Sequence, residues 1–256
     1  MGCRKVTGRA GAGQPCAILP AMCSRYFLDA DGNVIAYTFN VPVHDRIRKR
    51  FNIAPTQEAP VIRAGEGGAR EVALLRWGLV PFWAKDAKIG TSTINARSES
   101  AATKPAFREA FKRRRCIVPA SGFFEWQGEP GRKQPYAITV PGQPLFAFAG
   151  LWETWKPGEG PALETFTILT TEPNEQVARI HDRMPVILPM ADLDAWLAGD
   201  AATAQALLKP WEGPLELRAV GRFVSNVKHE GPECLADAPA PPREEPPPPP
   251  RQGSLL

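Results

Sequence analysis

The sequence has no long hydrophobic run, since nowhere in its 256 residues do eighteen apolar residues stand together. A helix that crosses a membrane needs about that many, so the sequence argues against a transmembrane protein. The short apolar stretch of residues 17–22 is interrupted by Pro20, which argues against a secretory signal peptide. Val6 stands where a myristoylation signal at Met1-Gly2 needs Ser or Thr. We therefore expect a cytoplasmic protein.

Residues that bind metal ions are few. The chain has three histidines, and none has a second histidine at the spacing of a metal site. Its five cysteines are odd in number, lie far apart and include no Cys-x-x-Cys pair. This pattern argues against a zinc site and against a disulfide framework. We expect no metal ion, no cofactor and a reducing compartment.

The residues that are present are typical of a globular protein, with 43% hydrophobic and 23% charged side chains. The formal net charge of +4 allows a polyanionic partner but does not require one. Basic residues gather at positions 46–50 and again at 112–115. Either cluster could hold phosphates, but the sequence alone favours the solvated face of a helix.

Composition divides the chain into three parts. Residues 1–21 contain three basic and no acidic residues, which predicts a disordered extension or a stretch that is not translated, because Met22 offers a second start. Residues 237–256 include five consecutive prolines and are predicted to be a disordered, polyproline-type tail. Residues 22–236 have no linker and no repeat, so they are expected to form one domain.

Short apolar runs bounded by turn residues predict strands in this domain. The predicted strands are Val72–Leu75, Cys116–Pro119, Tyr136–Val140, Leu145–Leu151 and Phe166–Thr170. Helical patterns fit His44–Phe51, Ala106–Arg113, Glu175–Ile180, Met190–Ala198 and Ala201–Leu208. Strands in adjacent hairpins with helices set apart indicate an α+β fold with a mainly antiparallel sheet.

Three polar segments are unusual for pure packing. Residues 95–99 place small and polar side chains in a row, Glu125 stands between bulky aromatic residues, and His181 directly precedes Asp182. Each has a plain explanation: Asn95 as a helix cap, Glu125 as an arginine partner, His181 as a core histidine. Together with the thiol of Cys23, they would supply the nucleophile, the proton acceptor and the orienting group of a reaction. A carboxyl group in an apolar pocket should have a raised pKa, which would let Glu125 both accept and donate protons.

Residues 76–83 place aromatic side chains on both sides of a predicted chain bend, and Lys85 and Lys88 follow them. Such a segment could stack on exposed bases while the cations hold phosphates. The alternative is a core-packing loop with two buried tryptophans, and the sequence alone favours that alternative.

Taken together, nine short segments resemble the SOS-response-associated peptidase family, whose members process abasic sites. In chain order the segments are Met22–Tyr26, Asn52–Thr56, Arg76–Leu79, Asn95–Glu99, Arg115–Pro119, Gly122–Trp126, Ala149–Trp152, Ile180–Pro185 and Ser225–Lys228. They cover about residues 22–235. The resemblance implies a barrel-like sheet with flanking helices, and a monomer that binds single-stranded DNA and is associated with the nucleoid when it is bound to DNA.

The resemblance also implies a covalent chemistry. In this family the cysteine follows the initiator methionine, whose removal leaves a free α-amine beside the thiol. The amine condenses with the aldehyde of a ring-opened abasic site, and the thiol then closes a thiazolidine ring that shields the site. Cys23 matches that cysteine. An α-amine has a pKa of about 7.7–8.0, and a free thiol near 8.5 needs only modest help to ionise.

The same resemblance assigns roles to seven further residues. Asn95 would orient the sugar, Glu125 would shuttle protons, and His181 would assist ring opening. Arg25 and Arg97 would hold phosphates, while Pro55 and Trp77 would line the DNA channel. Family members are also linked to autoproteolytic release of the N-terminal residue and to lyase chemistry.

The chain departs from the family pattern at two points. Ser24 stands where the family usually has glycine, which would crowd the approach of DNA to the cysteine. Cys23 is also internal, and an internal cysteine has no α-amine; a start at Met22 is favoured over proteolytic removal of residues 1–22. Two other functions stay open: a cysteine peptidase or amidohydrolase of the N-terminal-nucleophile kind, and a module that binds single-stranded DNA without a covalent bond.

Overall fold

The computed structural model describes residues 23–239 of the chain. The extension predicted over residues 1–21 and the alternative start at Met22 lie outside the described residues. The same holds for the tail predicted from residue 237, apart from its first three residues.

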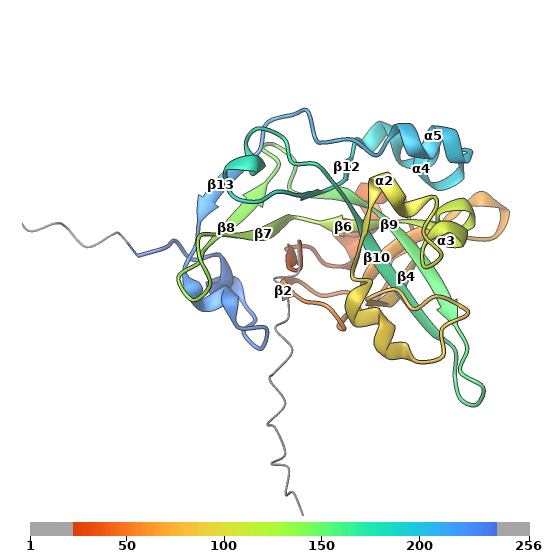
Figure 1. Cartoon of the computed structure of the whole chain (residues 1–256). Coiled ribbons are helices and arrows are strands. Elements are labelled where there is room, and N and C mark those ends of the chain that lie inside the picture. The colour runs from red at the N-terminus through yellow and green to blue at the C-terminus, as the bar shows by residue number, and fades with distance from the viewer. Residues whose placement is uncertain (1–22, 240–256) are drawn as a thin grey trace, which may run out of the picture.

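Five strands close on themselves into a barrel, part of which is seen at the right of Figure 1. The closed path runs through β3 (Glu58–Ala64), β4 (Arg70–Trp77), β10 (Leu163–Thr171), β9 (Phe146–Trp155) and β6 (Arg115–Ala120), which returns to β3. Within this path the pairing of β4 with β10 is parallel, and the other four pairings are antiparallel. The prediction of an α+β, barrel-like and mainly antiparallel fold is confirmed.

Three short strands extend this sheet. β5 (Asn95–Arg97) lies parallel to β10, β11 (Met184–Pro185) lies antiparallel to it, and β12 (Ile187–Leu188) pairs with β9. Thr170 of β10 is paired with both β5 and β11. The end of β10 therefore brings the segment that carries Asn95 close to the loop that carries His181.

A second, five-stranded sheet holds the N-terminal end of the domain. Its strands lie in the order β13 (Glu216–Ala219), β8 (Gln134–Thr139), β7 (Gly122–Gln127), β1 (Tyr26–Leu28) and β2 (Arg50–Ile53), all antiparallel. The pairing of β1 with β7 sets Cys23, just before β1, beside Glu125 on β7.

Gly122 permits that pairing. A Cβ atom on Gly122 would lie 2.3 Å from the ring of Phe27, so the strand can pass this ring only without a side chain. The close approach explains why glycine opens β7.

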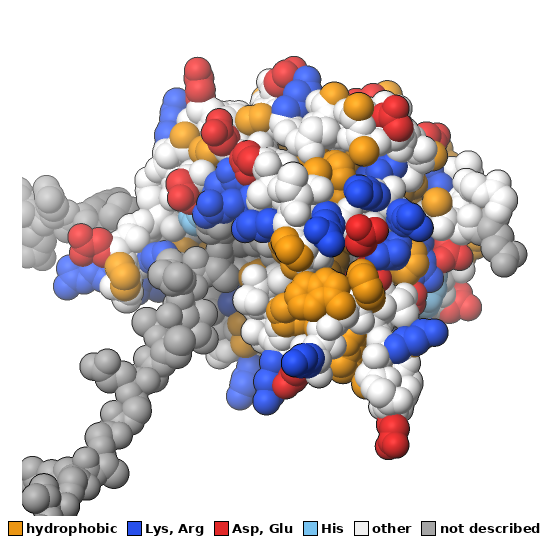
Figure 2. All heavy atoms as spheres, turned by 45° about the vertical axis from the view of Figure 1, so that its right-hand side comes forward, with side chains coloured by type: hydrophobic (Ala, Val, Ile, Leu, Met, Phe, Trp, Pro, Cys, Tyr) orange, Lys and Arg blue, Asp and Glu red, His pale blue; other side chains and the backbone are white. Residues whose placement is uncertain are grey.

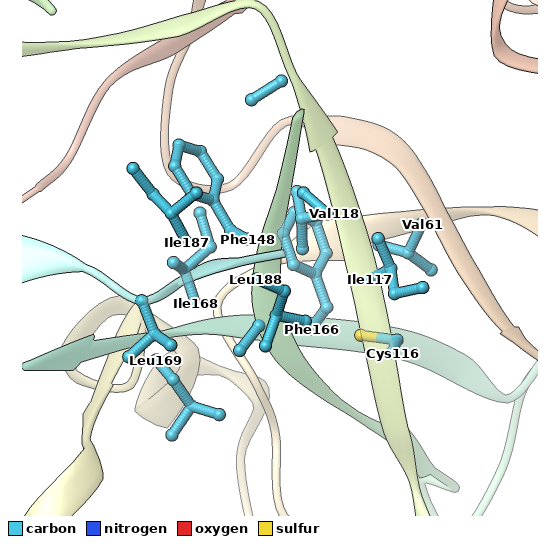
Figure 3. Close-up of a cluster of buried hydrophobic side chains, with 14 of the residues drawn as sticks. Val61, Cys116, Ile117, Val118, Phe148, Phe166, Ile168, Leu169, Ile187 and Leu188 are labelled. Carbon is cyan, nitrogen blue, oxygen red and sulfur yellow. The ribbon is translucent and has the colours of Figure 1, made fainter. Parts of the chain in front are cut away.

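The barrel interior is filled by aromatic and β-branched side chains, which suit a pleated, buried surface. Figure 3 shows part of this cluster, with Val118 of β6 beside its cross-strand partner Phe148 of β9, while Ile117 lies on the other face of β6 near Val61 of β3, and Phe166 of β10 lies nearby. All of these side chains are fully buried. A closed barrel has no open sheet edge and keeps its outward-facing loops in fixed positions.

Short helices lie outside the sheets. They are α1 (Gly32–Phe39), α2 (Ser98–Ala101), α3 (Arg108–Arg113), α4 (Leu193–Ala198) and α5 (Ala201–Ala206). α4 and α5 lie side by side at the upper right of Figure 1, where α4 packs on β6. Among residues 23–239, no helix has the length and apolar character needed to cross a membrane.

The five predicted strands are all present, whereas two of the predicted helices are not. Residues 44–49 form no helix, since only Asp45 and Arg46 lie in a turn and β2 begins at Arg50. The apolar spacing of Ile47 and Phe51 suits a helix, but Tyr26 pairs with Ile53 across the sheet and draws the chain into a strand. Of the helix predicted over residues 175–180, only a 3-10 turn at Val177–Arg179 forms.

Candidate active site

Cys23 lies buried just before β1, with 3% of its surface exposed. Its main-chain nitrogen donates a hydrogen bond to Oε1 of Glu125 at 2.9 Å. Its thiol donates to the carbonyl oxygen of Arg183 at 3.9 Å. The φ angle of Cys23 is +45°, in the left-handed region that a residue with a side chain rarely adopts. The surrounding contacts therefore hold Cys23 in a strained backbone conformation.

Glu125 is a buried carboxyl group between Phe124 and Trp126 of β7, with only 3% of its surface exposed. Burial penalises the ionised form and raises the pKa of Glu125 to about 7. The nearby imidazole of His181 opposes this shift. The sequence predicted a raised pKa from the aromatic neighbours alone. A carboxyl group with a pKa near neutrality can accept a proton and return it.

His181 faces Glu125 from the loop between β10 and β11. Its Nδ1 accepts a hydrogen bond from the backbone N–H of Arg183 at 3.2 Å. Oδ1 of Asp182 lies 3.1 Å from the same nitrogen, and Nε2 on the other side of the ring lies 3.9 Å from Oε2 of Glu125. This distance is too long for a hydrogen bond between His181 and Glu125. Both side chains can therefore still bond to a substrate that lies beside them.

Asn95 completes the group from β5. Its side-chain amide Nδ2 donates to the carbonyl oxygen of Cys23 at 3.3 Å. The four residues predicted to carry the chemistry, which are Cys23, Asn95, Glu125 and His181, thus lie around one point although they are far apart in the chain. Their chemical roles stay a prediction.

The sequence predicted that the Cys23 thiol would need only modest help to ionise, but its surroundings in the structure oppose ionisation. Burial raises the pKa of Cys23 well above its usual value, and the neighbouring carboxyl of Glu125 raises it further. Arg183 acts in the opposite direction with a smaller effect. The Cys23 side chain is therefore a neutral thiol near pH 7, and a base must remove its proton during any reaction.

An open pocket of about 180 Å³ adjoins this cluster. It is lined by Ser24, Arg25, Glu125, Trp126, Lys133, His181 and Ser225. The guanidinium of Arg25 lies over the ring of Trp126 at 5.6 Å, and it donates to Asn52 Oδ1 at 3.0 Å and to the carbonyl of Val224 at 2.9 Å. These contacts fix the Arg25 cation at the pocket wall, where it can meet an anion.

Asn52 ties β2 to the C-terminal segment beneath this pocket. Its buried side-chain amide donates to the carbonyl oxygens of residues 224, 226 and 229, at 3.2, 2.9 and 2.8 Å.

We predict that Asn52→Ala lowers the free energy of unfolding by about 3 kcal/mol, because buried carbonyl groups lose their donor. Urea denaturation of wild type, Asn52→Ala and the exposed control Asn33→Ala checks this, and equal midpoints for all three would refute it.

The remaining predicted DNA contacts differ in exposure. Arg97 at the end of β5 is exposed, and Pro55 in the loop after β2 is half-buried. The prediction for Trp77 is wrong. Its indole is fully buried, stacks on Phe166, meets Tyr26 edge to face and donates to the carbonyl of Ile94 at 2.8 Å. A ring enclosed in the core cannot stack on a base.

Exposed rings lie in the same aromatic segment, a few residues further on. Phe82 and Trp83 are 54% and 49% exposed, and Lys85 and Lys88 follow them. Figure 2 shows apolar surface gathered on one face with Lys and Arg side chains around it. The stacking surface predicted for residues 76–83 is therefore available at Phe82 and Trp83, and not at Trp77.

Sequence reasoning gave no role to three residues at the site. Lys133 lines the pocket from the loop between β7 and β8, and no motif marks it. Glu99 and Arg183 belong to the matched segments, but only the structure shows that they form an ion pair. Within the described part of the chain, no group of three or more His, Cys, Asp or Glu side chains could hold a metal ion.

Comparisons with known proteins agree on one family. The family model described as SOS response associated peptidase (SRAP) matches residues 22–227. The chain is 40% identical over 222 residues to the abasic site processing protein YoqW of Bacillus subtilis, covering 84% of this chain and 99% of that protein. It is 33% identical over 224 residues to the abasic site processing protein HMCES of Gallus gallus, covering 74% of this chain and 66% of that protein.

Solved structures show the same fold. A crystal structure of a protein from Bacteroides thetaiotaomicron superposes with a TM-score of 0.75 at 29% identity, over 84% of this chain and 100% of that one. A protein from Bordetella bronchiseptica gives a TM-score of 0.67 at 26% identity, over 78% and 100% of the two chains.

Proposed function

The chain belongs to the SOS-response-associated peptidase family, and we propose that it captures abasic sites in single-stranded DNA by a covalent bond to Cys23. The bond would be a thiazolidine ring, formed once Cys23 is the N-terminal residue. Two relatives are named abasic site processing proteins, which supports an abasic site as the substrate.

One observation carries the proposal: the main-chain nitrogen of Cys23 lies 2.9 Å from Oε1 of Glu125. In a chain that begins at Cys23, this nitrogen is the α-amine. A carboxyl group with a pKa of about 7 would then touch the atom that attacks the aldehyde. General acid–base catalysis requires this kind of direct contact.

The reaction balances with these residues alone. The neutral α-amine of Cys23 adds to the aldehyde carbon C1′ of the open sugar, and Glu125 protonates the departing hydroxyl so that water leaves and an imine forms. The thiol of Cys23 then adds to the imine carbon and its proton passes to the imine nitrogen, closing the five-membered ring. The sum is one aldehyde, one amine and one thiol giving one thiazolidine and one water.

Other residues would position the sugar and its phosphates. Asn95, which holds the carbonyl of Cys23, would orient the sugar, and His181 would move a proton at the ring oxygen while the sugar opens. Arg25 at the pocket wall and the exposed Arg97 would hold flanking phosphates, with Pro55 beside the strand.

Phe82 and Trp83 are the exposed aromatic side chains of the segment of residues 76–83. Stacking on an aromatic ring contributes about 1–3 kcal/mol per base, so we predict that Phe82→Ala with Trp83→Ala weakens binding of undamaged single-stranded DNA about 10- to 100-fold. Fluorescence anisotropy with a labelled oligonucleotide measures it. Tyr37→Ala removes an exposed ring from helix α1 and serves as the control, and equal affinity of all three proteins would refute the assignment.

The experiment for the proposed function uses a chain that begins at Cys23, mixed with single-stranded DNA that carries one abasic site. We expect a heat-stable adduct on a denaturing gel, with an intact mass equal to protein plus DNA minus one water. A chain that shifts DNA only on a native gel would overturn covalent capture and would leave simple DNA binding.

A peptidase or amidohydrolase would use the same cysteine and carboxyl, and the family name includes peptidase activity. The buried, protonated thiol favours attack on a reactive imine over attack on a stable amide, because amide cleavage relies on a thiolate. Autoproteolytic release of the N-terminal residue and lyase activity at the abasic site belong to this proposal as secondary activities. The mass of the protein before and after incubation detects the first, and cleavage of the DNA strand detects the second.

A further inference from the structure

Arg183 contacts both Cys23 and His181 through its backbone. Its backbone carbonyl accepts the thiol hydrogen of Cys23, and its backbone N–H donates to Nδ1 of His181. Its guanidinium forms two hydrogen bonds to Glu99. We propose that the ion pair of Arg183 with Glu99 is a positioning device that holds His181 in the tautomer with its proton on Nε2 and fixes the direction of the Cys23 thiol.

The backbone contacts of Arg183 decide the protonation pattern of the site. The N–H donor at 3.2 Å from Nδ1 favours a lone pair there and a ring proton on Nε2, which faces Glu125. The carboxylate of Asp182 lies 3.1 Å from the same nitrogen and favours a proton on Nδ1 instead. If residue 183 shifts, the donor leaves Nδ1 and only the Asp182 carboxylate remains, so the Nδ1–H tautomer gains population. The carbonyl that orients the thiol of Cys23 moves with the same residue.

The side chain of Arg183 fixes this backbone from the opposite side of β10. The guanidinium meets both carboxylate oxygens of Glu99, at 2.7 and 2.9 Å, and donates to the carbonyl of Thr170 at 2.7 Å. Arg183 precedes β11, and Glu99 lies in α2, directly after β5. Since β5 and β11 both pair with the end of β10, the ion pair joins the segment of Asn95 to the loop of His181.

The ion pair is well formed for such a role. Two parallel hydrogen bonds between arginine and carboxylate define an orientation as well as a distance, which lysine cannot reproduce. The Arg183 side chain is only 10% exposed, while Glu99 reaches it from a half-exposed position. The hydrogen bonds from Arg183 hold the pKa of Glu99 below its usual range, so the pair is charged near pH 7.

Positioning and electrostatics predict opposite results for Glu99→Gln. Removing the carboxylate leaves the Arg183 cation unbalanced, and this cation lowers the pKa of the Cys23 thiol. An electrostatic role alone therefore predicts a faster reaction. A positioning role predicts a slower one, because loss of alignment by about 1 Å can reduce a rate up to a hundredfold.

The test combines a spectroscopic and a kinetic measurement, of which only the second rests on the proposed function. In the full 256-residue chain, the ¹⁵N shifts of the His181 ring report its tautomer, with His181→Gln assigning the signals. In chains that begin at Cys23, the rate of adduct formation with abasic DNA is followed between pH 5 and 9. The variants are Glu99→Gln, Arg183→Lys and the charge-swapped double variant Glu99→Arg with Arg183→Glu. Glu153→Gln is the control, since it removes a more buried carboxylate from the Arg114 ion pair on β9.

We expect wild type and Glu153→Gln to show the Nε2–H tautomer and the same rate at each pH. Glu99→Gln and Arg183→Lys are expected to show mixed tautomers and rates about tenfold lower, and the charge swap is expected to recover part of both. An unchanged tautomer in Glu99→Gln, or a faster adduct, would overturn the positioning role. If wild type forms no adduct, the proposed function fails, while the ring shifts still decide whether the ion pair sets the tautomer.

Discussion

Cys23→Ala is expected to abolish the covalent adduct with abasic DNA, with no band above background on a denaturing gel. Alanine at the N-terminus keeps the α-amine and so still permits an imine, but it has no thiol to close the ring. An imine hydrolyses on heating, whereas a thiazolidine persists. A heat-stable band from Cys23→Ala would therefore contradict the ring-closing role of the thiol.

Two controls locate the effect in this residue. Cys234→Ala removes a thiol that is buried in a separate cluster with Phe27 and Phe124, and it should leave the adduct unchanged. The 256-residue chain with Cys23 inside a peptide should be inactive as long as intact mass shows that residues 1–22 are attached. If that chain reacts at the same rate as the chain that begins at Cys23, an α-amine is not required.

Glu125→Gln is expected to slow adduct formation about a hundredfold near pH 7, because general acid–base catalysis of this kind contributes a factor of about 10²–10⁴. Glutamine keeps the shape of the side chain and can still accept a hydrogen bond from the Cys23 nitrogen. It cannot donate and recover a proton. The variant should also lose the part of the pH–rate profile that titrates near the pKa of Glu125, which is about 7.

The same variant should become more stable relative to wild type as the pH rises. The pKa of Glu125 is raised from 4.5 to about 7 by burial, so between these values the unfolded chain releases a proton that the folded chain retains. Wild type thus loses free energy of unfolding from about pH 5 to pH 7, on the order of 3 kcal/mol in total, whereas Glu125→Gln does not. Urea denaturation of the 256-residue chains at pH 5 and pH 8 measures the difference.

Both readouts are needed to identify Glu125 as the proton carrier. A variant that is slow and also unfolded would indicate a structural role, and a variant that is stable and as fast as wild type would contradict catalysis. Glu153→Gln, which removes a carboxylate of similar burial on β9, provides the control for stability alone.

The strands were more predictable than the helices, for a physical reason. Runs such as Phe166–Thr170 are buried on both faces of the sheet, so their apolar and β-branched character is imposed along the whole length. The region of Ile47 is different, since its helical spacing competes with a pairing between Tyr26 and Ile53 that local sequence does not reveal. The helix predicted over residues 175–180 is likewise reduced to a 3-10 turn at Val177–Arg179, and His181 follows in the loop before β11.

The candidate site residues could be proposed from their motifs, but their geometry could not. Cys23, Glu125 and His181 lie in recognisable segments, yet nothing local states that they meet. Trp77 shows the converse, because its motif is matched while its ring is enclosed by Tyr26 and Phe166. Exposure is a property of the folded chain, and a motif carries no direct information about it.

The site is assembled from four separate parts of the sequence, and its key contacts join residues 102, 160 and 72 positions apart. None of these contacts survives in an unfolded or truncated chain, so reactivity should disappear with the cooperative loss of structure in denaturant and not gradually before it. A nascent chain that has emerged only through its first hundred residues carries the thiol but lacks the acid and the imidazole. The proposed reactivity toward a damaged strand therefore requires the complete fold as well as a free α-amine on Cys23.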